Sequence, residues 1–194
     1  MPPPPWSTLP TPGRPASFVM DPQIVPSEDP LYAVAARSND SGLPLRMVLR
    51  VGWCGLSIYA EGSAVAHRWL VCDGTSWGAR GGGGGGGGPD MPLRAGIGAS
   101  WSSPSQPGAF VAVSVNGTAT ASISRVQIEF DDGHIADAAV SDGVFGWFYA
   151  RRPAPWRSPG RRYVHQILGA DPVRVIGLSG DGRELARQEL RPMP

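Results

Sequence analysis

The chain has 194 residues, including 27 glycines and 21 prolines, so a single β-sandwich or two half-sized units is the largest fold it can build. All 17 basic residues are arginine. Schiff-base enzymes, Walker-type nucleotide sites and Ser-x-x-Lys hydrolases are therefore excluded, because each needs a lysine. The formal net charge of +1 gives no global field for nucleic acid or anionic lipid, so we expect no specific nucleic-acid binding.

The first thirty residues contain ten prolines, which fix the backbone and remove hydrogen-bond donors. The sequence therefore predicts a disordered Pro-rich tail over residues 1–30. This stretch has neither the basic nor the apolar region of a signal peptide, and no apolar run in the chain reaches the ~18 residues that span a bilayer. We expect no membrane span in this chain.

Residues 31–80 are expected to form a β-hairpin unit. Residues 31–37, LYAVAAR, admit two interpretations: a helix capped by the preceding polar residues, or the strand that we favour because a turn cluster and the alternating run LRMVLRVG follow. GLSIYAEG and AVAHRWLVCDG then read as two strands joined at residues 61–63. Eight consecutive glycines at 81–88 have no side chains to pack, so a loop or linker is predicted over 81–90.

Residues 91–191 show a series of short strand signals separated by Gly-rich turns. FVAVSV is expected to end at a turn at Asn116-Gly117, and three strands joined by the turns at 131–133 and 141–143 predict an antiparallel meander. The aromatic run VFGWFYA has large side chains on both faces, which is typical of a central strand. YVHQILG and VRVIGLS are expected to be further strands, followed by a hairpin around Asp181-Gly182.

This pattern predicts an all-β chain with an antiparallel, Ig-like β-sandwich over 91–191, built as one unit or as two small β units joined by the polyglycine segment. The run RVQIEFDDGHIADAAVSDGVFGWFYA, followed by a strand and GDGREL, resembles the Ig-like C-terminal module of uncharacterised actinobacterial proteins, many of them membrane-anchored. The resemblance covers residues 109–190. It implies an Ig-like fold and no particular activity.

Cys54 and Cys72 lie in neighbouring predicted strands, and we expect a disulfide between them in preference to two buried thiols. A bridge would place the protein outside the cytoplasm, and two thiols would favour the cytoplasm. A zinc site built from this pair and His67 would lack a fourth ligand, so no metal or other cofactor is predicted.

Two further motifs resemble catalytic motifs in their residue types alone. Gly74, Thr75, Ser76, Trp77 and Gly78 match the G-x-S-x-G nucleophile elbow, but glycines follow where the elbow needs a supporting helix, so we expect an ordinary turn.

The second motif is a group of two acids and a histidine, Asp131, Asp132 and His134, which sits where a hairpin turn itself favours Asp and Gly. His67 and His165 stand in apolar runs and are expected to pack.

The strongest binding signal is a cluster of arginines around a tryptophan in a Pro-rich connection. Its members are Arg151, Arg152, Trp156, Arg157, Arg161 and Arg162. Guanidinium groups and an indole can hold a carboxylate or phosphate by paired hydrogen bonds and stacking, although a solvated connection is the simpler interpretation. We therefore expect a non-enzymatic binding or structural accessory module with a protein or anionic partner. The alternative is a serine hydrolase with Ser76 as nucleophile and His67 or His134 as base.

Overall fold

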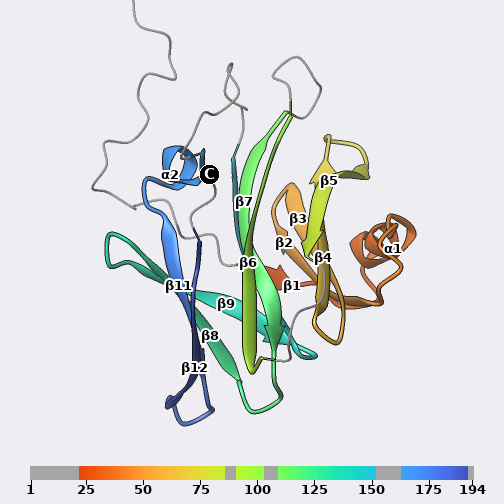
Figure 1. The fold of residues 1–194 in the computed structure, drawn as a ribbon. Helices are drawn as coiled ribbons and strands as arrows, with labels where there is room; N and C mark the ends of the chain where they lie inside the picture. The colour runs from red at the N-terminus through yellow and green to blue at the C-terminus, as the bar shows by residue number, and fades with distance from the viewer. Residues whose placement is uncertain (1–21, 86–90, 103–108, 152–162, 192–194) are drawn as a thin grey trace, which may run out of the picture.

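The structure is a computed structural model that describes residues 22–85, 91–102, 109–151 and 163–191. It is an all-β fold of two antiparallel sheets packed together, as expected (Figure 1). The five-stranded sheet, in the order β1-β2-β3-β4-β5, consists of β1 (Gln23–Ile24), β2 (Leu45–Val51), β3 (Cys54–Glu61), β4 (Ala64–Cys72) and β5 (Trp77–Gly85). The seven-stranded sheet, in the order β12-β11-β8-β9-β10-β7-β6, consists of β6 (Leu93–Trp101), β7 (Val111–Ala119), β8 (Arg125–Phe130), β9 (Ile135–Ser141), β10 (Val144–Arg151), β11 (Pro172–Leu178) and β12 (Glu184–Glu189).

The two sheets bury one apolar core between them. Leu56, Ile58 and Trp69 of the five-stranded sheet pack with Phe110 and Phe148 of the other, and Trp69 meets Phe148 edge to face with ring centroids 5.8 Å apart. Residues on both sides of the glycine run therefore contribute to the same core. Neither helix in the described part of the chain is long and apolar enough to cross a membrane.

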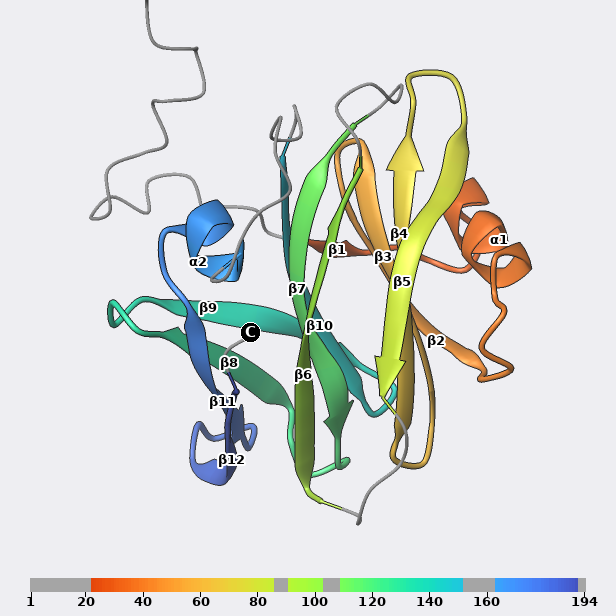
Figure 2. The same cartoon turned by 45° about the horizontal axis from the view of Figure 1, so that its top comes forward.

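The seven-stranded sheet curls until its two outer strands, β6 and β12, come together (Figures 1 and 2). The side chain of Gln188 on β12 bridges them: its Oε1 accepts a hydrogen bond from the Ala95 backbone nitrogen at 2.7 Å, and its Nε2 donates to the Ala95 carbonyl at 3.0 Å. The Gln188 side-chain amide thus makes the two hydrogen bonds that a backbone peptide group of β12 would make if β12 were paired with β6. A second core, which includes Val126, Ile128 and Trp147, fills the space enclosed by this sheet.

Replacing Gln188 with methionine should weaken this closure. The substitution keeps the length of the side chain but leaves the amide and carbonyl of Ala95 without partners, which costs about 1–2 kcal/mol for part-buried groups. Urea unfolding of the variant should report that loss. Gln127→Met is the matched control, because the Gln127 amide bonds only the exposed carboxylate of Asp137, and its cost should stay below about 0.5 kcal/mol.

The predicted meander is confirmed. Strands β8, β9 and β10 are consecutive in the sheet, with turns at Asp131-Asp132-Gly133 and at Asp142-Gly143. On β10, Phe145 and Trp147 face the enclosed core, whereas Phe148 faces the other sheet. The strand is therefore covered on both sides, as its aromatic content indicated.

The strand favoured for residues 31–37 is wrong, and the capped helix is what forms. Helix α1 (Pro30–Arg37) begins after Asp29, whose Oδ1 accepts a hydrogen bond from the Leu31 nitrogen at 2.8 Å, and proline occupies its first position. Leu31 and Ala35, one turn apart, bury against the outer face of the five-stranded sheet (Figure 2). The ordered chain also begins earlier than predicted, because β1 and the buried Val25 lie inside the expected tail; residues 1–21 lie outside the described residues.

Two more element predictions fail. YVHQILG forms helix α2 (Tyr163–Leu168), whose buried residues Val164, Ile167 and Leu168 follow the spacing of a helix, and Gly169 ends it with φ +78°. His165 is thus in a helix and not in a strand. Asn116 and Gly117 are not a turn either, because β7 runs through them and pairs with β6 and β10 on its two sides.

Candidate functional site: hollows beside a glycine edge strand

The prediction of a loop over the glycine run is wrong for residues 81–85, which continue β5. They pair with β4 through the backbone, which needs no side chains, and β5 is the last strand of its sheet. Gly81, at φ +56°, is an extra residue that shifts the register beside Arg68 and Trp69. We call exposed residues 81–85 the glycine edge. Glycines 86–88 lie outside the described residues.

On the side of the glycine edge that faces the seven-stranded sheet there is a hollow of about 270 Å³, which we call the notch. The polar side chains that line it are those of Ser63, His67, Arg94 and Asn116. Much of the remaining wall is glycine, from β5, β6 and β7. Aromatic side chains fill one end of the space between the two sheets. At the other end glycines take the place of larger residues, and the notch is the space that they leave.

His67 lies at the centre of this arrangement. Its ring meets Trp69 edge to face at 6.2 Å, and a Cβ atom built on Gly98 would lie 2.7 Å from its Cε1 and Nε2 atoms. Glycine at 98 is what gives the ring room. Neither ring nitrogen makes a hydrogen bond within the described part of the chain, and burial lowers the pKa of His67 to about 4. The imidazole is therefore neutral at pH 7, with one donor and one acceptor.

Asn116 of β7 completes the notch, with the buried Ser114 next to it on the same face of the strand. Ser114 is fully buried and Asn116 is 5% exposed, and the Asn116 amide donates to Ser114 Oγ at 3.0 Å. That is the single hydrogen bond of the Asn116 side chain among the described residues, so its carbonyl oxygen and one N–H remain for a ligand. Sequence reasoning missed both residues because Asn-Gly was interpreted as a turn. The signal was the alternation of apolar and small polar residues in VAVSVN.

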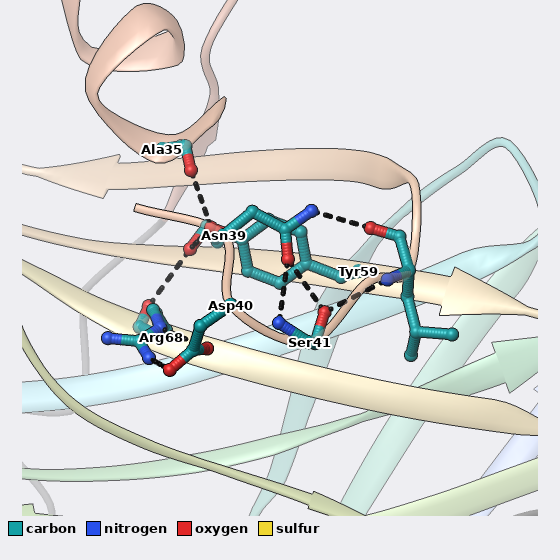
Figure 3. Close-up of polar contacts among 8 residues, drawn as sticks. Ala35, Asn39, Asp40, Ser41, Tyr59 and Arg68 are labelled. Atoms are coloured by element: carbon teal, nitrogen blue, oxygen red, sulfur yellow. Dashed lines mark hydrogen bonds and ion pairs between the residues drawn. The ribbon is translucent and has the colours of Figure 1, made fainter. Parts of the chain in front are cut away.

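The opposite face of the glycine edge has a second hollow of about 370 Å³, which we call the α1-side hollow. Asp40, Ser41, Tyr59 and Arg68 line it, together with residues 81–84; Figure 3 shows how these four side chains lie. Arg68 pairs with Asp40 through both its Nε and its Nη2 atoms. The wall is therefore fixed by charge pairing and offers mostly polar groups.

Hydrogen bonds hold the loop that carries Asp40 and Ser41 in place (Figure 3). Asn39 Oδ1 accepts from the Ser41 nitrogen and hydroxyl, and its Nδ2 donates to the Leu43 carbonyl at 2.7 Å. The buried Tyr59 hydroxyl donates to the Ala35 carbonyl at 2.7 Å and fastens the end of α1 to the sheet. The loop and helix beside the α1-side hollow are thus tied to neighbouring residues by hydrogen bonds.

The two hollows are adjacent, and both include His67 and Gly84. A Cβ on Gly83 would point at the His67 ring, whereas one on Gly84 would point at the Ala66 side chain on the other face. The alternation of a strand therefore directs the Cβ positions of successive glycines toward opposite faces, that of His67 and that of Ala66. Because all these positions are glycine, both hollows are open.

The expected disulfide is not formed. Cys54 is buried in the core between the sheets and lies opposite Val71. Since neighbouring residues of a strand point to opposite faces, Cys72 is directed toward the α1 side, where its strand partner Trp77 packs. Because Cys54 is paired with Val71 and not with Cys72, the two sulfur atoms lie on opposite faces of the sheet.

The G-x-S-x-G motif forms a turn, as expected, and a strand follows it instead of a helix. The Asp73 carboxylate accepts hydrogen bonds from the backbone nitrogens of Thr75 and Ser76, which lowers its pKa to about 2. His67 is five residues before the end of β4, so Ser76 and His67 are separated by roughly 17 Å along the strand. The structure does not bring this serine to this base.

The other predicted polar groups serve turns or lie elsewhere. Asp132 Oδ1 accepts from the His134 nitrogen at 2.9 Å, and Asp131 Oδ1 accepts from the Asp171 nitrogen at 3.0 Å. Among residues 22–85, 91–102, 109–151 and 163–191, no group of three or more His, Cys, Asp or Glu is placed to hold a metal ion. Arg151 ends β10 with a half-buried side chain. The rest of the arginine cluster, Arg152, Trp156, Arg157, Arg161 and Arg162, lies outside the described residues.

Comparison of the chain with protein-family models finds no match, and comparisons with curated proteins and with solved structures find none either. The resemblance to an Ig-like actinobacterial module therefore stays a prediction. What the chain can bind has to be argued from its own geometry.

Proposed function

We propose that the protein is a non-enzymatic binding module that holds a polar ligand at the glycine edge. The observation that carries the proposal is that the buried Asn116 and the half-buried His67 both line the notch, and both retain hydrogen-bonding groups that no described residue satisfies. Buried polar groups in folded proteins normally have partners, so such groups mark a place for a ligand or bound water.

The chemistry of the notch favours binding over catalysis. A nucleophile would need a base within hydrogen-bond reach, and the described contacts give His67 an aromatic neighbour and no acid or hydroxyl partner. A neutral imidazole and an amide are well suited to a ligand that both donates and accepts hydrogen bonds. The arginine cluster at 151–162 remains a second expected contact for an anionic partner, argued from sequence alone.

The notch offers a variant that blocks it without a steric clash. A Cβ atom on Gly96 would meet nothing within 4 Å and Gly96 lines the notch, so we expect Gly96→Val to fill part of the notch without a clash at its Cβ atom. Gly78→Val on β5 is the matched control, since a Cβ there meets a single arginine nitrogen at 4.0 Å and Gly78 does not line the notch.

The test is a titration of ¹⁵N-labelled protein with small amides, hydroxy acids and carboxylates, followed by NMR. We expect saturable shifts of the Asn116 side-chain amide and the His67 ring for some of these compounds. The shifts should persist in Gly78→Val and disappear in Gly96→Val. A notch that no compound occupies, or occupancy unaffected by Gly96→Val, would contradict the proposal.

A further inference from the structure

Resting on the proposed function, we infer that the natural occupant is an extended peptide that adds as a strand to the glycine edge and places neutral, hydrogen-bonding side chains in the two hollows by turns. The expected side chains are Ser, Thr, Asn or Gln.

The first step is that the glycine edge is the outer side of its sheet. β5 pairs with β4 on one side and ends the sheet, so along residues 82–85 its outer row of N–H and C=O groups has no strand partner in the described part of the chain. Proteins usually protect such an edge with charged side chains, prolines, bulges or short strands. Here the bulge at Gly81 stops short of residues 82–85, and glycine removes every protective side chain. Along residues 82–85, therefore, no side chain of β5 itself stands in the way of an approaching extended chain.

The second step is the position of the hollows. In an antiparallel pair, residues directly opposite one another share a face. A residue opposite Gly83 would therefore direct its side chain to the face of the His67 ring, which lines the notch, and the next residue, opposite Gly82 or Gly84, to the face of Arg68 and Ala66, which line the α1-side hollow. Two adjacent hollows on opposite faces of one edge strand fit consecutive side chains of an added strand. A compact ligand would reach one of them.

The third step is the chemistry of the walls. The notch offers the neutral groups of His67, Asn116 and Ser63 beside the guanidinium of Arg94, and the α1-side hollow offers Ser41 beside the paired Asp40 and Arg68. A side chain that donates and accepts hydrogen bonds can satisfy the free groups of His67 and Asn116 in the notch, whereas an apolar one would leave those groups without partners. Charge within the α1-side hollow is already compensated by the Arg68 ion pair, so a neutral polar residue suits it best.

Strand addition has a signature that pocket binding lacks. Along a strand, alternate N–H groups point toward the neighbouring strand, so methylating one alternate set of peptide nitrogens removes the hydrogen bonds and methylating the other set does not. The probe is a set of acetylated heptapeptide amides with Thr and Val at the ends and Ser, Thr, Asn or Gln at the centre. Affinity for the full-length protein is measured by fluorescence anisotropy, first on the unmodified peptides and then on the two methylated forms of the tightest binder.

We expect one methylation pattern to weaken binding by about tenfold or more and the other to leave it nearly unchanged. Gly96→Val should remove the preference for particular residues at the central peptide positions that face the notch. Asp40→Ala should alter the preference at the alternate positions, which face the α1-side hollow. Gly78→Val is the control for both.

Equal effects of the two patterns, no effect of either, or no binding by any heptapeptide would overturn strand addition. If the small compounds still occupy the notch in that case, the proposed function stands and this inference alone fails; if they do not, both fail.

Discussion

A Gly117→Ala variant should lose about 3 kcal/mol of unfolding free energy, the upper end of what overpacking usually costs. The Cβ atom would lie 1.7 Å from the Arg94 carbonyl oxygen and 2.9 Å from the Ala95 Cα. These are backbone atoms of β6, which is paired with β7 at this point, so the clash can be relieved only by separating the strands. Chemical denaturation followed by intrinsic fluorescence measures the change.

The control is Gly96→Ala on the partner strand, which lies opposite Asn116. A methyl group there meets nothing within 4 Å, so its stability should stay within about 1 kcal/mol of the natural protein and can rise slightly, because the unfolded chain loses freedom. Equal midpoints for the two variants would mean that β6 and β7 are not paired in this register. The comparison of the two variants therefore tests whether β7, the strand that carries Asn116, pairs with β6 in the described register.

The second large effect is a dependence of stability on pH that originates in His67. Burial lowers the pKa of this imidazole from 6.5 to about 4 in the folded protein. Between those values the unfolded chain binds a proton that the folded chain does not, so stability increases with pH across this window. The contribution of His67 to the free energy of unfolding is fully present above pH 6.5 and decreases as the pH drops toward 4. Its full size is about 3 kcal/mol, from 1.36 kcal/mol per pKa unit.

Urea unfolding of the natural protein and of His67→Gln, at several values between pH 4 and pH 8, isolates this contribution as a difference. The charged groups that share the hollows with His67 are Arg94, Arg68 and Asp40, and all three are retained in His67→Gln, so their contribution cancels in the difference. His134→Gln should keep the dependence, because His134 lies in the turn between β8 and β9. A His67→Gln variant with the full dependence of the natural protein would show that the imidazole is not buried as described.

Local chemistry decided the parts of the fold that the sequence predicted correctly. The strand-rich pattern, the meander over residues 125–151 and the covered β10 strand follow from alternation and from Asp-Gly turns, which depend on neighbouring residues only. α2 was missed although its buried residues have helical spacing, because three apolar residues in six fit a short strand almost as well. The choice between helix and strand for residues 31–37 depended on one capping carboxylate, that of Asp29.

Tertiary structure alone decided the candidate site. Asn116 and Gly117 have the letters of a hairpin turn, and only pairing with strands on both sides keeps them extended and buries the amide. The offset that separates Cys54 from Cys72 is a matter of register between two strands, which neither residue's neighbours determine. Glycines at 81–85 cannot specify a strand by themselves, because they have no side chains and the most backbone freedom to lose. Pairing with β4 orders them, and the absence of side chains that made them look like a linker is what leaves the two hollows open.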